Sequence, residues 1–536
     1  MDIYYSVKGD KKVASVSNND LSIDFSHDGH HCVVKVTAKE DIKLIKAKHS
    51  FPFNINFKDY YFLNGYQSWT DTKEYKLAKR ERNIKKSPHI ISHMFAMDKY
   101  GDSYFYKYSI RKSHGYDFFY SKGKNESFIY SLNGDIAYLL IELIKDQKYI
   151  HLTSLLDGVE LKKGEELKVF DFYFFDNYLE GLKSFNKDYP IVNKDKILGY
   201  TSWYNYYQNI NEEIILRDLD ALDSRVNVFQ IDDGYETFVG DWFDIDKNKF
   251  PNGLKGVVDK IHKKGYKAGI WLAPFAAETK SKLFKEHQDW LIKDKKNKPM
   301  KMGGNWSGFY ALDFYNLEAR DYIKKSLEYY MDLGFDFFKL DFLYASSLKE
   351  VNGKSRAMVQ KEAYQFLRDV LKDKIILGCG ANIINSAHVF DYLRVGPDVS
   401  LVFDDVPYMR LFHRERISTK VTIQNTIYRH LFDQRLFGND PDVFLLRDEN
   451  IKLSKEQKEA LTTINALFGS VLMTSDDIAT YDSEKKKILD RALQLFYKAK
   501  VTSIKTNKQL IHIEYELDGK IQRMKYNTKK GVLTHE

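Results

Sequence analysis

The sequence predicts a chain of three parts: an N-terminal antiparallel β-sandwich, a central (β/α)8 TIM barrel and a small C-terminal antiparallel β domain. Three observations support this prediction. The first third consists of short strand-like segments between turns, the middle alternates apolar strands with longer helical stretches, and the end returns to strands. A chain of 536 residues is long enough for two or three separate cores. We place the three parts at residues 1–185, 186–477 and 478–536.

The strand-like segments of the first part are rich in β-branched and aromatic residues. Residues 31–37 and 168–174 are typical, and turn signals such as Asn133-Gly134-Asp135 separate neighbouring segments. Several such strands at short spacing favour an antiparallel sandwich. Aromatic residues make up 15% of the chain. A sandwich core uses such residues, and so does a sugar-binding site, because aromatic planes stack on the C–H faces of sugar rings.

The middle part alternates strands and helices around eight strands, which is typical of a barrel of βαβ units. The alternative is an open, doubly wound sheet, but no glycine-rich phosphate turn follows the first strand. The predicted helices include residues 253–264, 317–333 and 354–371. The predicted strands are residues 198–203, 226–231, 268–273, 335–340, 374–378, 392–395, 443–446 and 470–474.

The last part, from about residue 478, is predicted to be β structure again. Residues 511–515 alternate apolar and polar side chains, and Leu517-Asp518-Gly519-Lys520 has the composition of a tight turn. This pattern indicates a small sheet that closes the chain.

Composition argues against several classes of protein. The net charge is +8, but 75 acidic residues nearly balance 83 basic ones, and no long basic block is interleaved with stacking aromatics. A scaffold role or a nucleic-acid partner is supported only by that charge, so we expect no nucleic-acid binding. The two cysteines, Cys32 and Cys379, are far apart and lie in no CxxC spacing, which argues against a disulfide framework or a zinc site. We expect neither a metal nor a cofactor.

The chain also lacks the usual membrane and export signals. Its N-terminus has no basic start followed by an apolar run. The most apolar short segment, residues 136–144, is too short to cross a bilayer and is interrupted by Glu142. We therefore expect a cytoplasmic protein without a membrane segment.

Charged and aromatic residues gather where the predicted barrel strands end, which is where the active site of a TIM barrel lies. Lys339 and Asp341 are two positions apart, so their side chains project to the same side of the sheet, where two charges are costly unless used or paired. The other residues at these strand ends are Trp203, Tyr204, Asp232, Asp233, Trp271, Cys379, Arg394 and Asp398.

Each of these residues also has a purely structural interpretation. Asp232-Asp233-Gly234 could be a turn, Lys339 and Asp341 could be a buried ion pair, and the aromatic residues could pack the barrel. All of these interpretations would have to hold together at one end of one barrel, and a single shared pocket explains them more simply. Because neither an HExxH zinc motif nor a GxSxG elbow is present, two aspartates on different strands, Asp341 and Asp398, indicate glycoside hydrolysis.

At these residues the sequence resembles glycoside hydrolase family 36, the clan-D α-galactosidases, in their compact bacterial form. The resemblance follows the barrel in order and extends through residues 64–69 into the first part. The matching barrel segments are residues 198–207, 230–235, 240–242, 250–255, 269–275, 338–342, 378–380, 394–398 and 439–442.

The resemblance implies a role for each matching residue. Asp341, in Lys339-Leu340-Asp341, matches the nucleophile, and Asp398 matches the acid/base. Asp232 and Asp233 match the pair that hydrogen-bonds O4 and O6 of galactose. The remaining matches are the sugar-contacting residues Lys339, Cys379 and Arg394 and the pocket-wall aromatics Trp203, Tyr204, Trp271 and Trp69.

The implied activity is that of a metal-independent, retaining α-galactosidase acting on small oligosaccharides with a terminal α-galactose, of the melibiose or raffinose type. Leu340 and Phe342-Leu343 depart from the larger family members, which often carry Trp and Asn there, and this leaves the fine specificity open. Action on α-N-acetylgalactosaminides and transfer to a sugar acceptor stay open as alternatives. So do a non-catalytic carbohydrate-binding role and assembly into a homo-oligomer.

Overall fold

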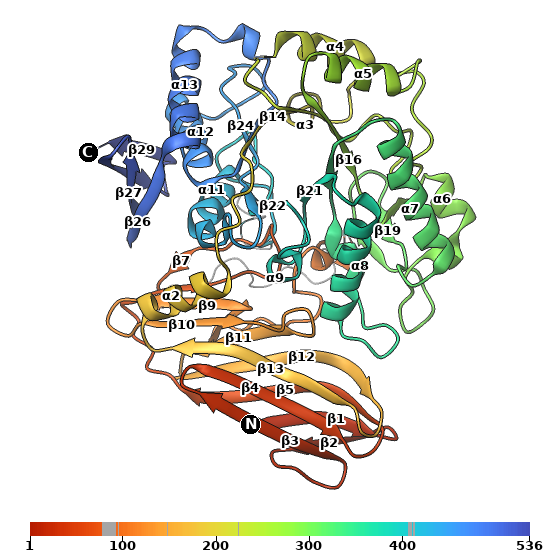
Figure 1. Ribbon diagram of the computed structural model, residues 1–536, viewed down its shortest axis with the longest axis vertical. Helices are drawn as coiled ribbons and strands as arrows, with labels where there is room; N and C mark the ends of the chain where they lie inside the picture. Colours follow the sequence, from red (N-terminus) through yellow and green to blue (C-terminus); the bar gives the residue numbers. More distant parts are fainter. Residues whose placement is uncertain are drawn as a thin grey trace.

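The computed structural model describes residues 1–77, 93–94, 96–146, 148–222, 224–405, 410 and 413–535. Two stacked sheets at the N-terminal end support a barrel of strands and helices, and a small sheet at the C-terminal end lies beside the barrel (Figure 1). The predicted fold class, sandwich, barrel and C-terminal sheet, is confirmed. The boundaries at residues 185 and 477 stay predictions.

The N-terminal sandwich consists of two antiparallel sheets. Alternate residues point into its core, as in β4, where Cys32, Val34 and Val36 are buried. The first sheet has the order β2-β1-β5-β12-β11-β8, with β1 Asp2–Val7, β2 Asp10–Ala14, β5 Ile42–Pro52, β8 Lys112–Tyr116, β11 Tyr138–Ile144 and β12 Tyr149–Leu161. The second has the order β3-β4-β13-β10-β9-β6-β7, with β3 Leu21–Asp28, β4 His31–Ala38, β6 Tyr60–Leu63, β7 Glu74–Tyr75, β9 Phe118–Lys122, β10 Ser127–Ser131 and β13 Glu166–Phe175.

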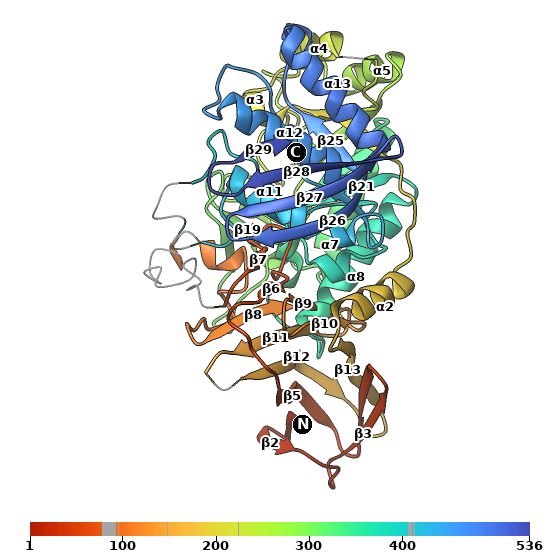
Figure 2. The same ribbon diagram turned by 90° about the vertical axis from the view of Figure 1, so that its left-hand side faces the viewer.

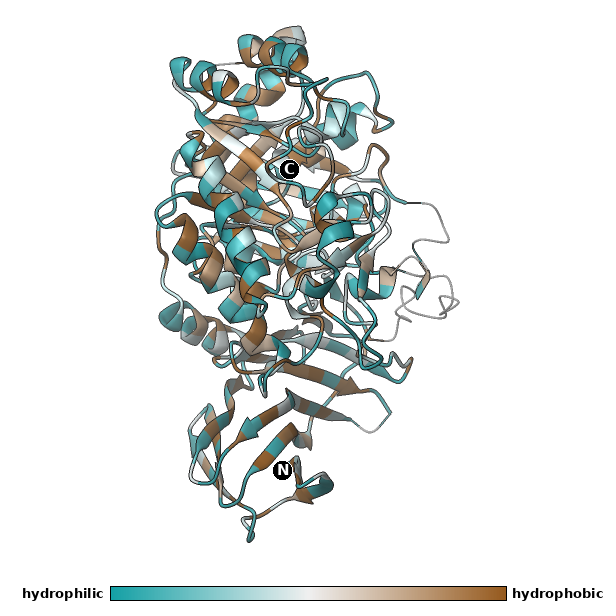
Figure 3. Ribbon diagram, turned by 90° about the vertical axis from the view of Figure 1, so that its right-hand side faces the viewer, coloured by the Kyte–Doolittle hydropathy of each residue, from teal (hydrophilic) through white to brown (hydrophobic). Residues whose placement is uncertain are grey.

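The barrel is a curled parallel sheet whose strands are buried on both faces, which explains their continuous apolar sequences. Figure 3 shows the mixture of hydrophobic strands and more hydrophilic outer helices. The strand order is β23-β22-β21-β20-β16-β15-β14-β25-β24. The bounds are β14 Ile197–Thr201, β15 Val228–Ile231, β16 Lys267–Leu272, β20 Phe337–Leu340, β21 Ile375–Gly378, β22 Tyr392–Arg394, β23 Gly438–Asp440, β24 Val443–Phe444 and β25 Val471–Thr474.

The seventh strand of the barrel is broken, and the prediction of one strand at residues 443–446 needs correction. Its first piece, β23, pairs with β22, and its second piece, β24, pairs with β25. Only Pro441 and Asp442 separate the two pieces, so the sheet closes on itself through them. Proline has no N–H for a ladder bond, and Asp442 has a positive φ of 75°, so neither residue continues the strand.

Most of the helices lie around the barrel and begin at a residue whose side chain caps the helix, whereas α2 packs against the sandwich strands. The side chain of Asn316, for example, accepts from the N–H groups of Glu318 and Ala319 at the start of α7. The helices are α2 Tyr178–Asp188, α3 Trp203–Tyr206, α4 Glu212–Ala221, α5 Lys255–Lys263, α6 Lys282–Glu286, α7 Leu317–Asp332, α8 Arg356–Leu371, α9 Ile383–Ser386, α11 Thr419–Tyr428, α12 Lys455–Phe468 and α13 Ser483–Lys498. None of the helices in the described ranges is long and apolar enough to cross a membrane.

An additional small sheet interrupts the barrel between β16 and α7. It has the order β17-β19-β18, with β17 Ala276–Glu278, β18 Lys301–Gly303 and β19 Phe309–Ala311. The loop between β18 and β19 carries Asn305 and Trp306, both of which line a cavity at the barrel mouth. The small sheet therefore places these two side chains at the barrel end where the strands terminate.

The C-terminal part begins with a helix, which corrects the expectation of strands directly after residue 478. Residues 483–498 form α13, because Asp482 caps the helix and Leu489, Ala492, Leu493 and Phe496 form one buried face. A four-stranded antiparallel sheet follows and lies across one side of the barrel (Figure 2). Its strands are β26 Lys500–Asn507, β27 Leu510–Leu517, β28 Lys520–Asn527 and β29 Val532–His535.

Candidate active site

The two predicted catalytic carboxylates lie at the junction of two cavities. Asp341 directly follows β20, and Asp398 follows β22 after a short turn. Both aspartates line a cavity of about 330 Å³, here named the inner cavity, and a cavity of about 410 Å³, here named the outer cavity. Asn305, Phe342 and Ile417 also line both cavities. The carboxylates therefore face two spaces that meet between them.

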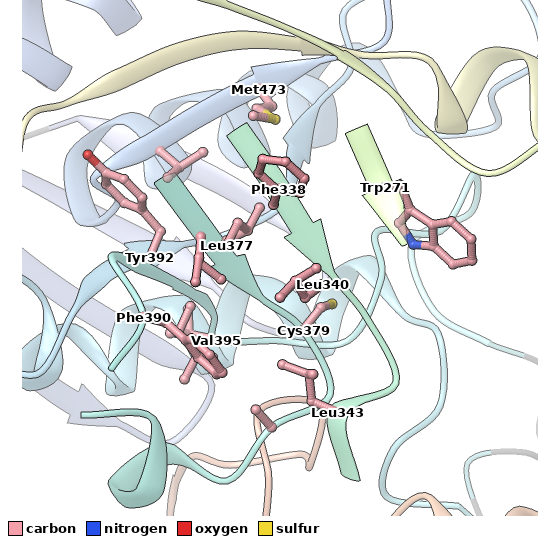
Figure 4. Packing of buried hydrophobic residues seen from close by; sticks show 14 of the residues in the cluster. Trp271, Phe338, Leu340, Leu343, Leu377, Cys379, Phe390, Tyr392, Val395 and Met473 are labelled. Carbon is pink, nitrogen blue, oxygen red and sulfur yellow. The ribbon is translucent and has the colours of Figure 1, made fainter. Parts of the chain in front are cut away.

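Asp341 is held rigidly by its neighbours. Its Oδ2 accepts from Trp271 Nε1 at 3.1 Å, and its Oδ1 accepts from the backbone N–H of Phe342 at 2.8 Å. Trp271 is labelled in Figure 4 at the end of β16, beside the buried side chains of the barrel core. Burial raises the pKa of Asp341 above its usual range, Lys339 opposes that rise, and the charge of Asp398 adds to it.

Lys339 is expected to set the acid limb of activity. If Asp341 is the attacking carboxylate it must be ionised, so kcat/KM is expected to fall as the pH drops through its raised pKa. Lys339→Met removes the charge that lowers this pKa, so the acid limb of the kcat/KM profile should move to higher pH. Lys374→Met is the control, because Lys374 pairs with Asp336 at the opposite end of the strands. If kcat/KM of Lys339→Met falls at the same acid pH as that of the wild-type protein, this role is contradicted.

Asp398 is anchored through one arginine that it shares with two other carboxylates. Arg394 Nη1 donates to Asp398 Oδ1 at 2.9 Å, and the side chain of Asp398 is 33% exposed. The same guanidinium contacts Asp440 through Nε and Asp442 through Nη2, each at 2.8 Å. Asp440 and Asp442 flank the break in the seventh strand. The two carboxylates beside the strand break thus hold Arg394 next to Asp398.

Asp442 also braces the wall of the inner cavity. Its Oδ2 accepts from the hydroxyl of Tyr204 and, at 2.7 Å, from the backbone N–H of Val399, which follows Asp398. Burial raises the pKa of Asp442 to about 7, Arg394 opposes the rise, and Asp398 adds to it. Asp442 and Asp440 were part of the matching motif, but the sequence reasoning gave them no role. The sequence feature that could have indicated a role for these two residues is Asp440-Pro441-Asp442 at the end of a strand.

Asp232 and Asp233 line the inner cavity together. Asp232 Oδ2 accepts from Lys339 Nζ at 2.8 Å and Gln230 Nε2 at 2.6 Å. Neighbouring residues of a continuing strand would point to opposite faces, but β15 ends at Ile231 and the chain turns at Gly234. Gly234 has a φ of 117°, and a Cβ there would lie 2.7 Å from the backbone of Gln208.

Trp306 is a site residue that the sequence reasoning missed. Its Nε1 donates to Asp233 Oδ2 at 2.8 Å, and Gln208 Nε2 donates to Asp233 Oδ1 at 3.1 Å. Burial raises the pKa of Asp233, and hydrogen bonds from Glu236, Trp306 and Gln208 oppose that rise. Trp306 follows Gly304-Asn305 in the loop after β18, and a large aromatic residue in such a glycine-containing loop was the available sequence signal.

Trp69, which the family resemblance implied as a pocket-wall residue, comes from the N-terminal sandwich and lines the outer cavity. Its Nε1 donates to Cys379 Sγ at 3.4 Å, and its ring packs edge-on against Phe342 and Tyr344. Trp69 lines the outer cavity, whereas Asp232, Asp233 and Lys339 line the inner one. Cys379 is buried, and burial together with the charge of Asp341 raises its pKa, so it stays a thiol.

The structure therefore brings all eleven predicted site residues to one end of the barrel. Asp341 and Asp398 line both cavities, and Cys379 and Arg394 contact residues that line them. In the described ranges, no group of three or more His, Cys, Asp and Glu side chains is arranged to hold a metal ion. The residues that line the inner cavity are Trp203, Tyr204, Asp232, Asp233, Trp271 and Lys339, and Trp69 lines the outer one.

Comparison with known proteins identifies a family model and several proteins to which this chain is similar. Residues 184–372 match the Melibiase family model. The α-galactosidase of Escherichia coli is 25% identical over 250 residues, which are 42% of this chain and 34% of that protein. The α-galactosidase Mel36A of Lactobacillus acidophilus is 31% identical over 149 residues, which are 26% of this chain and 20% of that protein. The matched region thus spans about a third and a fifth of these relatives.

The fold is shared over nearly the whole chain. The α-galactosidase TtGalA from Thermus thermophilus, in complex with stachyose, superposes with a TM-score of 0.70 at 23% identity, covering 92% of this chain and 99% of that one. The resemblance seen in the sequence motifs is confirmed. Residues 184–372 match the Melibiase model, the chain is similar in sequence to the α-galactosidases of Escherichia coli and Lactobacillus acidophilus, and it shares the fold of a glycoside hydrolase family 36 α-galactosidase.

Proposed function

We propose that this protein is a retaining α-galactosidase that releases terminal α-linked galactose from small oligosaccharides. The observation that carries the proposal is the position of Asp341 and Asp398 at the junction of the two cavities. The inner cavity holds Asp232, Asp233 and Lys339 and suits a sugar with several hydroxyl groups. The α-galactosidase names of the relatives and the stachyose bound to TtGalA support the substrate class.

In the proposed reaction the galactosyl unit occupies the inner cavity and the leaving group extends into the outer one. Ionised Asp341 attacks C1 while protonated Asp398 donates its proton to the departing glycosidic oxygen, giving a covalent β-galactosyl enzyme. Asp398 then takes a proton from water, which displaces Asp341 from C1 and releases α-galactose. Two inversions at C1 give net retention.

The electrostatics suit this exchange of roles. Asp341 and Asp398 line the same two cavities, so the charge of Asp341 acts on the space in which Asp398 transfers a proton. When Asp341 becomes an ester, that charge is absent during the water step. Asp440 and Asp442 both contact Arg394, the arginine that orients Asp398.

A direct assay tests the proposal. The protein should release p-nitrophenol from p-nitrophenyl α-galactoside faster than from the N-acetylgalactosaminide, and NMR should show α-galactose as the first product. Initial release of β-galactose would contradict the retaining mechanism. Binding of galactosides without any hydrolysis would instead support the non-catalytic carbohydrate-binding alternative.

Asp232 and Asp233 are expected to read the axial O4 and the O6 of galactose. A hydrogen bond to a charged group contributes about 1.5–3 kcal/mol, so Asp232→Asn or Asp233→Asn should lower the preference for α-galactosides over α-glucosides by roughly 10- to 100-fold. The ratio of the two kcat/KM values measures this preference. Asp241→Asn is a matched control, because among the described residues the buried side chain of Asp241 accepts from the backbone N–H groups of Lys282 and Leu283 and from no side chain. Unchanged preference in both site variants would make the two aspartates structural.

A further inference from the structure

Arg429 is a fully buried arginine between the N-terminal sandwich and the barrel. It follows α11 directly, has 0% relative exposure and is one of the largest completely buried side chains. Burial and the nearby charge of Arg414 lower its pKa to about 9. Burying a guanidinium costs free energy unless it is hydrogen-bonded. The hydrogen-bond partners of Arg429 therefore indicate its role.

All five hydrogen bonds of the Arg429 guanidinium go to neutral acceptors. Four acceptors belong to residues 64–72 of the N-terminal sandwich, and the fifth is a backbone carbonyl of the barrel. The bonds are Nε to Asn64 Oδ1 at 3.1 Å, Nη1 to the carbonyls of Ser68 and, at 2.8 Å, of Val395, and Nη2 to the Gln67 carbonyl at 3.1 Å and Thr72 Oγ1 at 3.0 Å.

Both ends of this network adjoin the catalytic pair. Val395 lies between Arg394 and Asp398, so Arg429 holds the chain that leads to the acid/base. Ser68 precedes Trp69, and its backbone N–H donates to the carbonyl of Ala381 at 2.8 Å. Ala381 comes two residues after Cys379, the partner of Trp69 Nε1. Arg429 therefore joins the loop that carries Trp69 to the exit of the strand that carries the acid/base.

We propose that Arg429 is a positioning residue that fixes Trp69, and with it one wall of the outer cavity, relative to Asp341 and Asp398. The proposal rests on the function proposed above, in which the outer cavity receives the leaving group. Trp69 packs against Phe342, which follows Asp341, so a shift of the loop changes the space in which the leaving group departs. Arg429 itself lies outside the described lining of both cavities and acts through the residues it holds.

The competing interpretation is that Arg429 only fastens the sandwich to the barrel. Arg356 provides the matched control, because it is another buried arginine at this interface. Its Nε donates to Asp157 of the sandwich at 3.0 Å, and its guanidinium lies 3.7 Å from the ring centre of Phe105. Arg356 starts α8 and is not among the described residues that line either cavity.

The test is a double-mutant cycle with Trp69. Arg429→Met and Arg356→Met are made alone and together with Trp69→Ala, and kcat/KM is measured on raffinose beside the melting temperature. Both arginine variants should melt at lower temperature. Arg429→Met should also lower kcat/KM about tenfold, since small misplacements of substrate-positioning groups have effects of this size or larger. In the Trp69→Ala background the same change should have little further effect, whereas Arg356→Met should change kcat/KM less than twofold in either background.

Arg429→Lys covers the case in which Arg429→Met does not fold, because lysine keeps the charge and up to three donors. It should give a smaller loss of kcat/KM that is again absent in the Trp69→Ala background. Additive losses for the Arg429 and Trp69 variants, or equal kinetic effects of the Arg429 and Arg356 variants, would overturn the proposal.

Hydrogen exchange separates this proposal from the proposed function. If the wild-type protein hydrolyses no α-galactoside, the proposed function fails, but exchange of residues 64–72 can still be measured. These amides should exchange faster in the Arg429 variants and at the wild-type rate in Arg356→Met. Unchanged exchange in the Arg429 variants, or equal changes in both, would show that Arg429 does not position the loop.

Discussion

Replacing Asp341 by glycine is expected to abolish turnover of α-galactosides, with a loss of roughly 10⁴-fold or more, since deleting the nucleophile of a covalent enzyme can cost on the order of 10⁶ in kcat. Trp271 Nε1 and the Phe342 N–H donate to the carboxylate of Asp341 and orient it. These donors cannot act as the nucleophile when the carboxylate is removed. Without the carboxylate no covalent intermediate forms.

Azide should restore activity of Asp341→Gly on an activated aryl galactoside. The glycine leaves space on the β face of C1, and azide entering that space displaces the leaving group to give β-galactosyl azide. NMR of the product identifies its anomeric form, and wild-type protein with azide serves as the control. Isolation of the α-azide from this variant would contradict the assignment of Asp341 as nucleophile.

Asp398→Ala is expected to separate good leaving groups from poor ones. Removing a general acid or base typically costs 10²–10⁴-fold, and we expect a loss of about this size on raffinose. A dinitrophenyl galactoside needs no proton on its leaving oxygen, so the first step should continue and the covalent intermediate should accumulate. The fold should survive, because Arg394 keeps its contacts with Asp440 and Asp442.

Azide again provides the decisive product for the Asp398 variant. It should attack the covalent intermediate from the face opposite Asp341 and yield α-galactosyl azide, the opposite anomer from that of the Asp341 variant. Mass spectrometry after rapid mixing should detect the galactosylated protein. Equal losses on raffinose and on the dinitrophenyl substrate would exclude Asp398 as the acid.

The barrel strands could be predicted from sequence because they are buried on both faces. Strands such as β15 and β20 are short, fully buried and mostly apolar. In a parallel barrel the residues that directly follow such strands all lie at the same end. For this reason Asp232 and Asp341 were recognisable as residues of a common pocket before any geometry was known.

The errors have local physical causes. The helix α13 begins with a highly charged first turn, so its buried face of Leu489, Ala492, Leu493 and Phe496 was overlooked. The seventh strand was assigned to one segment, because pairing with two different neighbours across Pro441 leaves each piece too short to show a strand pattern.

The remaining site residues depend on contacts that no local pattern contains. Trp306 comes from a sheet inserted between β16 and α7, and only the folded excursion shows that its indole meets Asp233. Arg429 follows a buried helix, and nothing in its neighbourhood in the sequence indicates five acceptors more than thirty residues away. Such residues are found when the folded chain is known.

The attachment of the Trp69 loop has a consequence for the order of events during synthesis on the ribosome. Cys379, the partner of Trp69, is made 310 residues after it, and Arg429 is made 365 residues after Asn64. At a synthesis rate of about 5–20 residues per second, Arg429 is added to the chain roughly 20–70 s after the loop. The sandwich can fold during this interval, but the carbonyls of Gln67 and Ser68 lack their final donor. A nascent chain released just before residue 429 would therefore carry all eleven predicted site residues but not the arginine that holds the Trp69 loop.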